Sequence, residues 1–111
     1  MTTLRRHRWP DFPVGVLPKL HRFLSRMPDR FGLTYHGADE LLGDAHGVIP
    51  MPAAADLFHP ETRVAEVYLD ERDRLTKVVL LAPHLSDRLD FTYVVSAEGL
   101  LVTAWAKPKA A

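Results

Sequence analysis

The densest group of basic side chains lies between residues 21 and 30. It contains His21, Arg22, Arg26 and Arg30. Guanidinium groups bind phosphate and carboxylate through paired hydrogen bonds, and an imidazole changes its charge near neutral pH. The segment therefore suits contact with a phosphate backbone or with an acidic partner.

Charge is unevenly distributed along the 111 residues, although the formal net charge is +0. Residues 1–30 carry seven basic and two acidic side chains, a net of +5, whereas residues 31–111 carry seven basic and twelve acidic ones, a net of −5. Two interpretations remain open. The basic segment of residues 1–30 binds an external polyanion, or it pairs with the acidic remainder of the same chain.

The first half of the chain predicts an extended arm followed by helices. Prolines and aromatic residues in residues 1–17 resist helix formation, so we expect a basic N-terminal arm there and a single domain over residues 18–111. A helix is predicted to begin at Pro18 and to end before Pro28, because its apolar residues recur at helical spacing. These are Leu20, Phe23, Leu24 and Met27. A second helix is predicted over Ala38 to Ala45.

The second half predicts strands. Four segments are rich in Val, Leu, Thr and Tyr and are bounded by turn residues: Thr62 to Leu69, Leu75 to Ala82, Leu89 to Ser96 and Leu100 to Lys107. Short links favour antiparallel neighbours. The predicted fold class is α+β, with one or two N-terminal helices packed on a four-stranded antiparallel β-meander.

The alternation of residues along each predicted strand indicates which side chains share a face of the sheet. Val78 and Leu80 are predicted to lie opposite Val79 and Leu81, and Leu101, Thr103 and Trp105 are predicted to share one face. Several strands are apolar on both faces, so we expect helices to cover one face and the arm or a partner to contact the other.

One resemblance rests on the order of these elements. The segment Leu20-His21-Arg22-Phe23-Leu24-Ser25-Arg26, the Phe31-Gly32-Leu33 turn and the closing Val102-Thr103-Ala104-Trp105 are similar to the small ribonuclease folds grouped with RelE, barnase and colicin E5. The toxin and phage-encoded members are the most similar. The resemblance implies metal-independent RNA cleavage, in which the 2′-hydroxyl attacks the adjacent phosphate.

The same resemblance implies roles for particular residues. His21 would act as base or acid, His84 is a second acid/base candidate, and Lys77 and Thr103 would contact the reacting phosphate. The residues implied in RNA or phosphate binding are Arg22, Arg26, Arg30, Arg88 and Trp105. The His-to-Arg spacings here are five and nine residues, where the family pattern has four and eight, and Pro28 interrupts the helix.

Each of these residues also has a structural interpretation. His21 beside an apolar stripe suits a half-buried structural histidine, Lys77 a solvent-facing strand lysine, and Trp105 core packing. The alternative hypothesis is therefore a non-catalytic domain that binds protein or RNA through its basic arm and sheet. The expected partners are RNA, an antitoxin, an immunity protein or a host protein.

Other chemistries are disfavoured by the sequence. There is no cysteine, which excludes disulfides, thiolate metal sites and a cysteine nucleophile. His36, Asp39, Asp44 and His46 match no familiar metal-ligand spacing, so neither a metal nor a cofactor is expected. No signal peptide or long apolar run is found, which predicts a cytoplasmic protein without membrane contact.

Overall fold

The computed structural model describes residues 3–26, 32–33, 57 and 59–109, and its helices and strands lie within these ranges. The elements in chain order are β1 (Arg5–Arg8), α1 (Val16–Arg26), β2 (Gly32–Leu33), β3 (Arg63–Leu69), β4 (Leu75–Ala82), the short 3-10 helix η2 (Pro83–Leu85), β5 (Leu89–Ser96) and β6 (Leu100–Pro108). The fold is α+β, as the sequence predicts. No described helix has the length and apolar character that crossing a bilayer requires.

The sheet has the strand order β1-β3-β4-β5-β6-β2. Strands β3, β4, β5 and β6 form the predicted antiparallel meander, with bounds within one residue of those expected at every end. Turn residues close each hairpin, and Gly99 adopts the positive φ of 86° that the β5–β6 turn requires.

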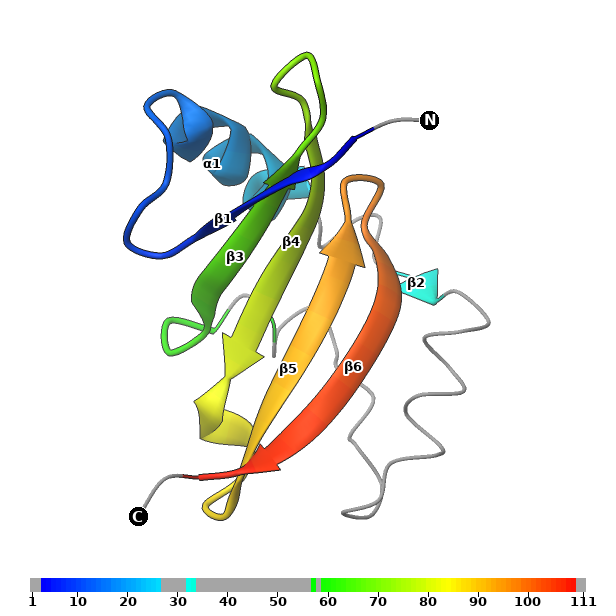
Figure 1. Ribbon diagram of the computed structural model, residues 1–111. Helices are drawn as coiled ribbons and strands as arrows, with labels where there is room; N and C mark the ends of the chain where they lie inside the picture. The colour runs from blue at the N-terminus through cyan, green and yellow to red at the C-terminus, as the bar shows by residue number, and fades with distance from the viewer. Residues whose placement is uncertain (1–2, 27–31, 34–56, 58, 110–111) are drawn as a thin grey trace.

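The predicted number of strands is wrong. β1 pairs antiparallel with β3 and makes a fifth antiparallel strand, and the two-residue β2 pairs parallel with β6 at the opposite edge. The Arg-Arg-His-Arg sequence of β1 has no apolar alternation, so nothing in its pattern indicates a strand. The part of the arm that forms β1 therefore lies at the edge of the sheet rather than across its open face (Figure 1).

Helix α1 begins two residues earlier than predicted. The first N–H groups of a helix have no partner within the helix, so Pro18 is accommodated at the third helical position. Leu20 and Phe23 of the predicted stripe are buried, and Leu24 packs against the core, as the spacing predicts. Val16, which lies outside the predicted stripe, is buried as well. Met27 and the predicted helix at 38–45 lie outside the described residues.

The core lies between α1 and one face of the sheet (Figure 1). Val78, Leu80 and Tyr93 belong to it and are 0% exposed, so the predicted assignment of faces holds for β4. We call the other side the open face; its central residues are Lys77, Val79, Val94, Thr103 and Trp105.

Strand β6 departs from simple alternation. Val94 pairs with Thr103 but Val95 pairs with Leu101, so Val102 is an extra residue in the ladder. Leu101 therefore points into the core, whereas Thr103 and Trp105 lie on the open face beside Val94 and Thr92. The expectation that the three share a face is wrong because of this irregularity.

Candidate functional site

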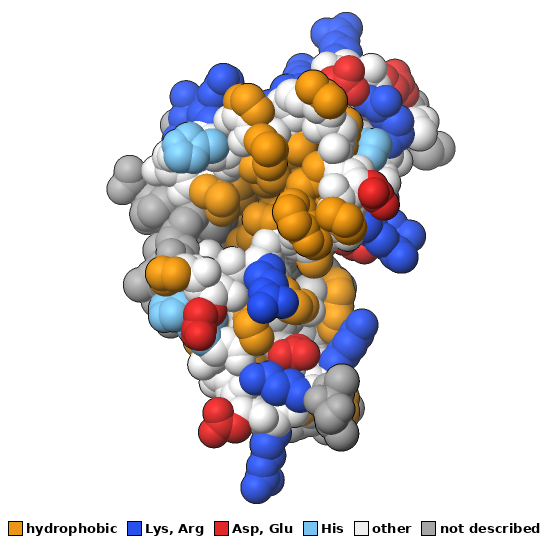
Figure 2. Space-filling view, turned by 90° about the vertical axis from the view of Figure 1, so that its left-hand side faces the viewer, with side chains coloured by type: hydrophobic (Ala, Val, Ile, Leu, Met, Phe, Trp, Pro, Cys, Tyr) orange, Lys and Arg blue, Asp and Glu red, His pale blue; other side chains and the backbone are white. Residues whose placement is uncertain are grey.

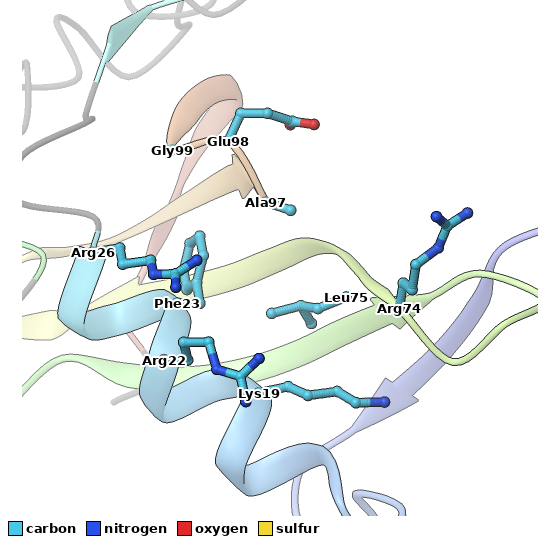
Figure 3. Close-up of a pocket in the computed structure, with 9 residues that line it drawn as sticks. All are labelled: Lys19, Arg22, Phe23, Arg26, Arg74, Leu75, Ala97, Glu98 and Gly99. Carbon is cyan, nitrogen blue, oxygen red and sulfur yellow. The ribbon is translucent and has the colours of Figure 1, made fainter.

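Four basic side chains line one cavity at the end of the sheet. Its volume is about 280 Å³, and its lining comprises Lys19, Arg22, Phe23, Arg26, Arg74, Leu75, Ala97, Glu98 and Gly99. We call this cavity the basic groove. Figure 3 shows α1 along one side and the turns of two hairpins on the other sides.

Helix α1 supplies most of the charge in the basic groove. Lys19, Arg22 and Arg26 are three and four residues apart, a spacing that places side chains on one side of a helix. Phe23 lies between them and is buried, so it anchors this face of the helix to the core. The amphipathic stripe found in the sequence thus also determines where the arginines point.

The two hairpins supply the opposite walls. In the β3–β4 turn, Asp70 accepts hydrogen bonds from the backbone N–H groups of Arg72 and Arg74, at 2.8 and 2.9 Å, and from Arg74 Nε at 2.9 Å. These bonds, led by the one from the Arg74 backbone, hold the pKa of the Asp70 carboxyl below its ordinary value. Arg74 is thereby held at the groove.

The β5–β6 turn is tied to the same region. The Ala97 N–H donates to the Thr76 carbonyl at 2.8 Å, and the Gly99 N–H donates to the Ser96 carbonyl at 2.9 Å. Glu98, at the tip of this turn, is the acidic side chain among the groove-lining residues.

The arginines of β1 and those of α1 differ in their partners. Arg5 pairs with Asp73, and Arg8 Nε lies 3.1 Å from Glu66 Oε1, which Arg6 also approaches at 4.0 Å. Within the described residues, Arg22 and Arg26 have neither an ion pair nor a side-chain hydrogen bond. The β1 arginines thus lie beside acidic side chains of the same chain, and Lys19 donates to the Asp73 carbonyl, whereas Arg22 and Arg26 have no such partner among the described residues.

His21 lies on another side of α1. It lines an apolar hollow of about 720 Å³ with Trp9, Phe12, Leu17, Leu20, Leu24, Arg63 and Val64. The hydrophobic side chains gathered in this hollow are visible in Figure 2. The Trp9 and Phe12 rings meet edge to face, with centroids 5.8 Å apart.

The remaining residues implied by the resemblance lie elsewhere. Lys77 and Thr103 are on the open face, where Lys77 Nζ lies 4.9 Å from the centroid of the Tyr68 ring. Thr103 is three strands away from the β3 residues beside His21, which corresponds to roughly 14 Å across the sheet. Trp105 is also on the open face, Arg88 is exposed in the β4–β5 connection, and Arg30 is outside the described residues. His21, Lys77 and Thr103 therefore do not share a cleft.

His84 belongs to a cluster that the sequence analysis missed. It stacks on His59, with ring centroids 4.1 Å apart and planes 14° from parallel, and Glu61 completes the group. The predicted pairing of the two strands would have indicated this cluster. Antiparallel pairing of Arg63 with Leu81 brings the residues before β3 next to those after β4.

No family model, curated protein or solved structure matches the chain. A function for this chain must therefore be inferred from its side chains and their arrangement.

Proposed function

We propose that the protein is a non-catalytic RNA-binding module that holds phosphate groups in the basic groove. The observation that carries this proposal is the position of Arg22 and Arg26, two exposed guanidinium groups without partners among the described residues, beside Lys19 and Arg74 in one cavity. Charged groups that are not neutralised within the chain are the ones that bind an external polyanion and release its counterions.

The arrangement suits a nucleic-acid strand. Arg22 and Arg26 are one turn apart, about 6 Å along the helix axis, which is close to the separation of neighbouring phosphates in a strand. The planar guanidinium group forms paired hydrogen bonds with phosphate oxygens. Two successive phosphates can therefore lie along the exposed side of α1.

The groove contacts the backbone rather than the bases. Phe23 is the aromatic side chain in its lining, and only 7% of Phe23 is exposed, so it offers no face on which a base could stack. Phosphate contacts position a nucleic acid but carry no sequence information. We therefore expect binding that depends strongly on salt and little on sequence.

Cleavage is not part of this proposal. Catalysis of phosphodiester transfer needs an acid, a base and a cation within hydrogen-bonding reach of one phosphate. The histidines of the described residues lie outside the basic groove: His21 lines the apolar hollow, His84 lies in the cluster with His59, and His7 is in β1.

The proposal is tested by measuring the binding of a labelled single-stranded RNA at several salt concentrations. The Arg22→Gln/Arg26→Gln double variant should bind more weakly. Its slope of log affinity against log salt should be shallower by about 1.4, since each phosphate contact in a single strand contributes about 0.7.

The matched control is Arg6→Gln/Arg8→Gln, which removes the same charge from β1. Because Arg6 and Arg8 share the carboxylate of Glu66 and lie outside the groove lining, this variant should lose less of the slope than the helix variant does. Equal losses in the two double variants, or an unchanged slope in the helix variant, would contradict the assignment of the groove. Equal binding of a polyglutamate peptide would favour an acidic protein partner instead of RNA.

A further inference from the structure

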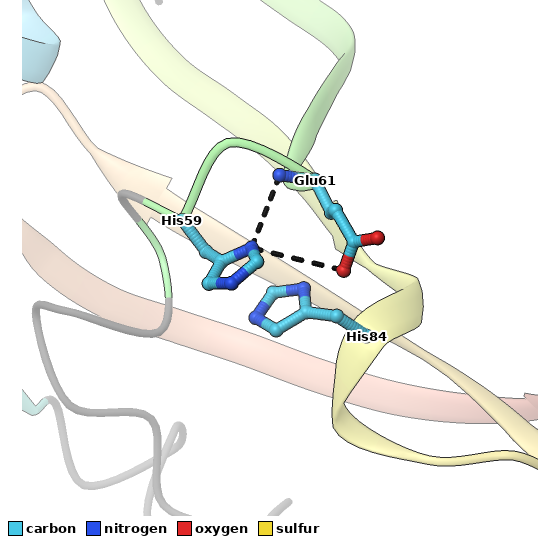
Figure 4. Close-up of side chains that lie close together, drawn as sticks. All are labelled: His59, Glu61 and His84. Carbon is cyan, nitrogen blue, oxygen red and sulfur yellow. Dashed lines mark hydrogen bonds and ion pairs between the residues drawn. The ribbon is translucent and has the colours of Figure 1, made fainter.

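The pairing of β3 with β4 brings together three potential metal ligands at the end of the sheet away from the basic groove. Residues 59–61 immediately precede β3, and η2 immediately follows β4. His59, Glu61 and His84 each present one ligand atom, and the three atoms lie within 4.8 Å of one another. Figure 4 shows both imidazoles beside the Glu61 carboxylate.

The imidazole of His84 lacks hydrogen-bond partners among the described residues. Both of its ring nitrogens are buried, and neither has a hydrogen-bond partner in the part of the chain that the structure describes. A neutral imidazole carries one N–H donor and one acceptor lone pair, and leaving such groups buried and unpaired costs free energy. A ligand that bonds to a ring nitrogen of His84 would remove part of this cost.

We infer that His59, Glu61 and His84 bind a divalent metal ion of the zinc class. Two imidazole nitrogens and one carboxylate oxygen are a ligand set that zinc and its neighbours favour, and tetrahedral zinc accepts a water molecule as the fourth ligand. The metal would supply the partner that a His84 nitrogen lacks.

To bind one ion, the ligand atoms must come closer together by up to about 1.5 Å. Metal–ligand bonds of about 2.0–2.1 Å in a tetrahedron place the ligand atoms roughly 3.3 Å apart. His59 Nδ1 and Glu61 Oε2 are already 3.8 Å apart. Metal binding would close the remaining separation to His84.

His59 is the ligand that must move. Stacked rings cannot direct two in-plane lone pairs at one point, so its ring must rotate out of the stack with His84. Its Nδ1 also accepts a hydrogen bond from the Glu61 N–H at 3.1 Å, which the metal would replace. The side chains of His59 and Glu61 are 44% and 65% exposed, so solvent leaves room for this movement.

The test is a titration of the purified full chain with Co²⁺, followed by its visible absorption, and with Zn²⁺, followed by calorimetry. We expect one ion per chain. His59→Ala, Glu61→Gln and His84→Ala should each weaken binding by at least about tenfold.

Two controls make the result specific to this cluster. His21→Ala removes an exposed imidazole elsewhere, and His36→Ala/His46→Ala removes two histidines that the sequence offers as alternative ligands; both should bind as the wild type does. His59 and Glu61 are exposed, so their variants test the site even where His84→Ala fails to fold. Absence of 1:1 binding, or wild-type affinity in the His59 and Glu61 variants, would overturn the inference.

Discussion

Asp70 and Arg74 form a salt bridge, with 2.9 Å between Asp70 Oδ2 and Arg74 Nε, inside a turn that Asp70 also caps. The carboxylate is buried, with 8% of its side chain exposed, whereas 69% of the Arg74 side chain is exposed. One buried acidic group thus closes the β3–β4 hairpin and holds a cation at the basic groove. The charge of the groove therefore depends on the integrity of this turn.

Asp70→Asn should destabilise the protein in a pH-dependent manner. The folded-state pKa of Asp70 is lowered from its ordinary value of 3.8, so the carboxylate contributes stability above that pH. This contribution is lost as the pH falls through the folded-state pKa. Thermal melts from about pH 7 to about pH 2 should show a lower Tm for the variant at neutral pH and a difference that shrinks in acid. A difference that does not change with pH would show that geometry, rather than charge, explains the effect.

The meander and the helix could be predicted because their patterns are strong. Apolar runs bounded by turn residues give the β3 to β6 strands, and apolar residues at helical spacing give α1. β1 could not be predicted, since its Arg-Arg-His-Arg sequence is held by backbone pairing to β3 and by the pairs of Arg5 with Asp73 and Arg8 with Glu66. Those contacts join residues more than 50 positions apart.

The candidate site was predicted in part. Arg22 and Arg26 follow from the polar side of a predicted helix, but their convergence with Arg74 depends on how α1 crosses the sheet. Thr103 and Trp105 were assigned to the wrong face because the extra residue at Val102 shifts the alternation of β6. A single irregularity of this kind leaves no clear mark in the sequence.

Glu98→Gln should strengthen RNA binding. Glu98 is the acidic side chain among those that line the basic groove, and it lies across the cavity from α1 in Figure 3. The negative charge of Glu98 repels the phosphates of RNA. Its removal should strengthen binding by about 0.5 kcal/mol, or roughly twofold in affinity, at moderate salt. Binding titrations of Glu98→Gln and of Glu71→Gln, an exposed acidic residue outside the groove lining, provide the comparison. Equal gains in both variants would indicate a general charge effect.

Phe23→Ala and Arg22→Gln should affect different properties of α1: the first lowers the stability of the fold, and the second weakens RNA binding. Phe23 is buried in the core, so its truncation should lower the free energy of unfolding by about 3–5 kcal/mol. Arg22→Gln, the neighbouring exposed residue, should change it by less than about 0.5 kcal/mol while weakening RNA binding. Urea denaturation of both variants measures the two effects. A large loss of stability in Arg22→Gln would mean that its guanidinium has a structural role.

His21→Ala tests the ribonuclease hypothesis against the binding proposal. His21 is exposed and borders the apolar hollow beside Leu17, on a different side of α1 from the basic groove. We expect the wild type to leave a labelled RNA intact, and His21→Ala to bind it with unchanged affinity and the same salt dependence. Cleavage by the wild type that disappears in His21→Ala would instead support a ribonuclease.

Arg63→Gln should strengthen metal binding at the inferred site. Arg63 lines a shallow cavity together with Pro60, Glu61, Pro83 and His84, so its positive charge lies near the proposed metal ligands. A nearby cation opposes a second one and also competes for the Glu61 carboxylate. Replacing it with glutamine removes the charge while keeping much of the side chain's length.

The expected change for Arg63→Gln is a severalfold increase in Co²⁺ affinity, and the change should diminish as salt screens the repulsion. Arg72→Gln, an exposed arginine in the β3–β4 turn, is the matched control and should leave the affinity unchanged. If Arg63 also stabilises the fold, Arg63→Gln should lower the Tm of the metal-free protein. If Arg63 only repels the metal ion, the Tm should not change. Unchanged Co²⁺ affinity in Arg63→Gln with an unchanged Tm would show that the ion, where it binds, lies away from Arg63 and from His59, Glu61 and His84.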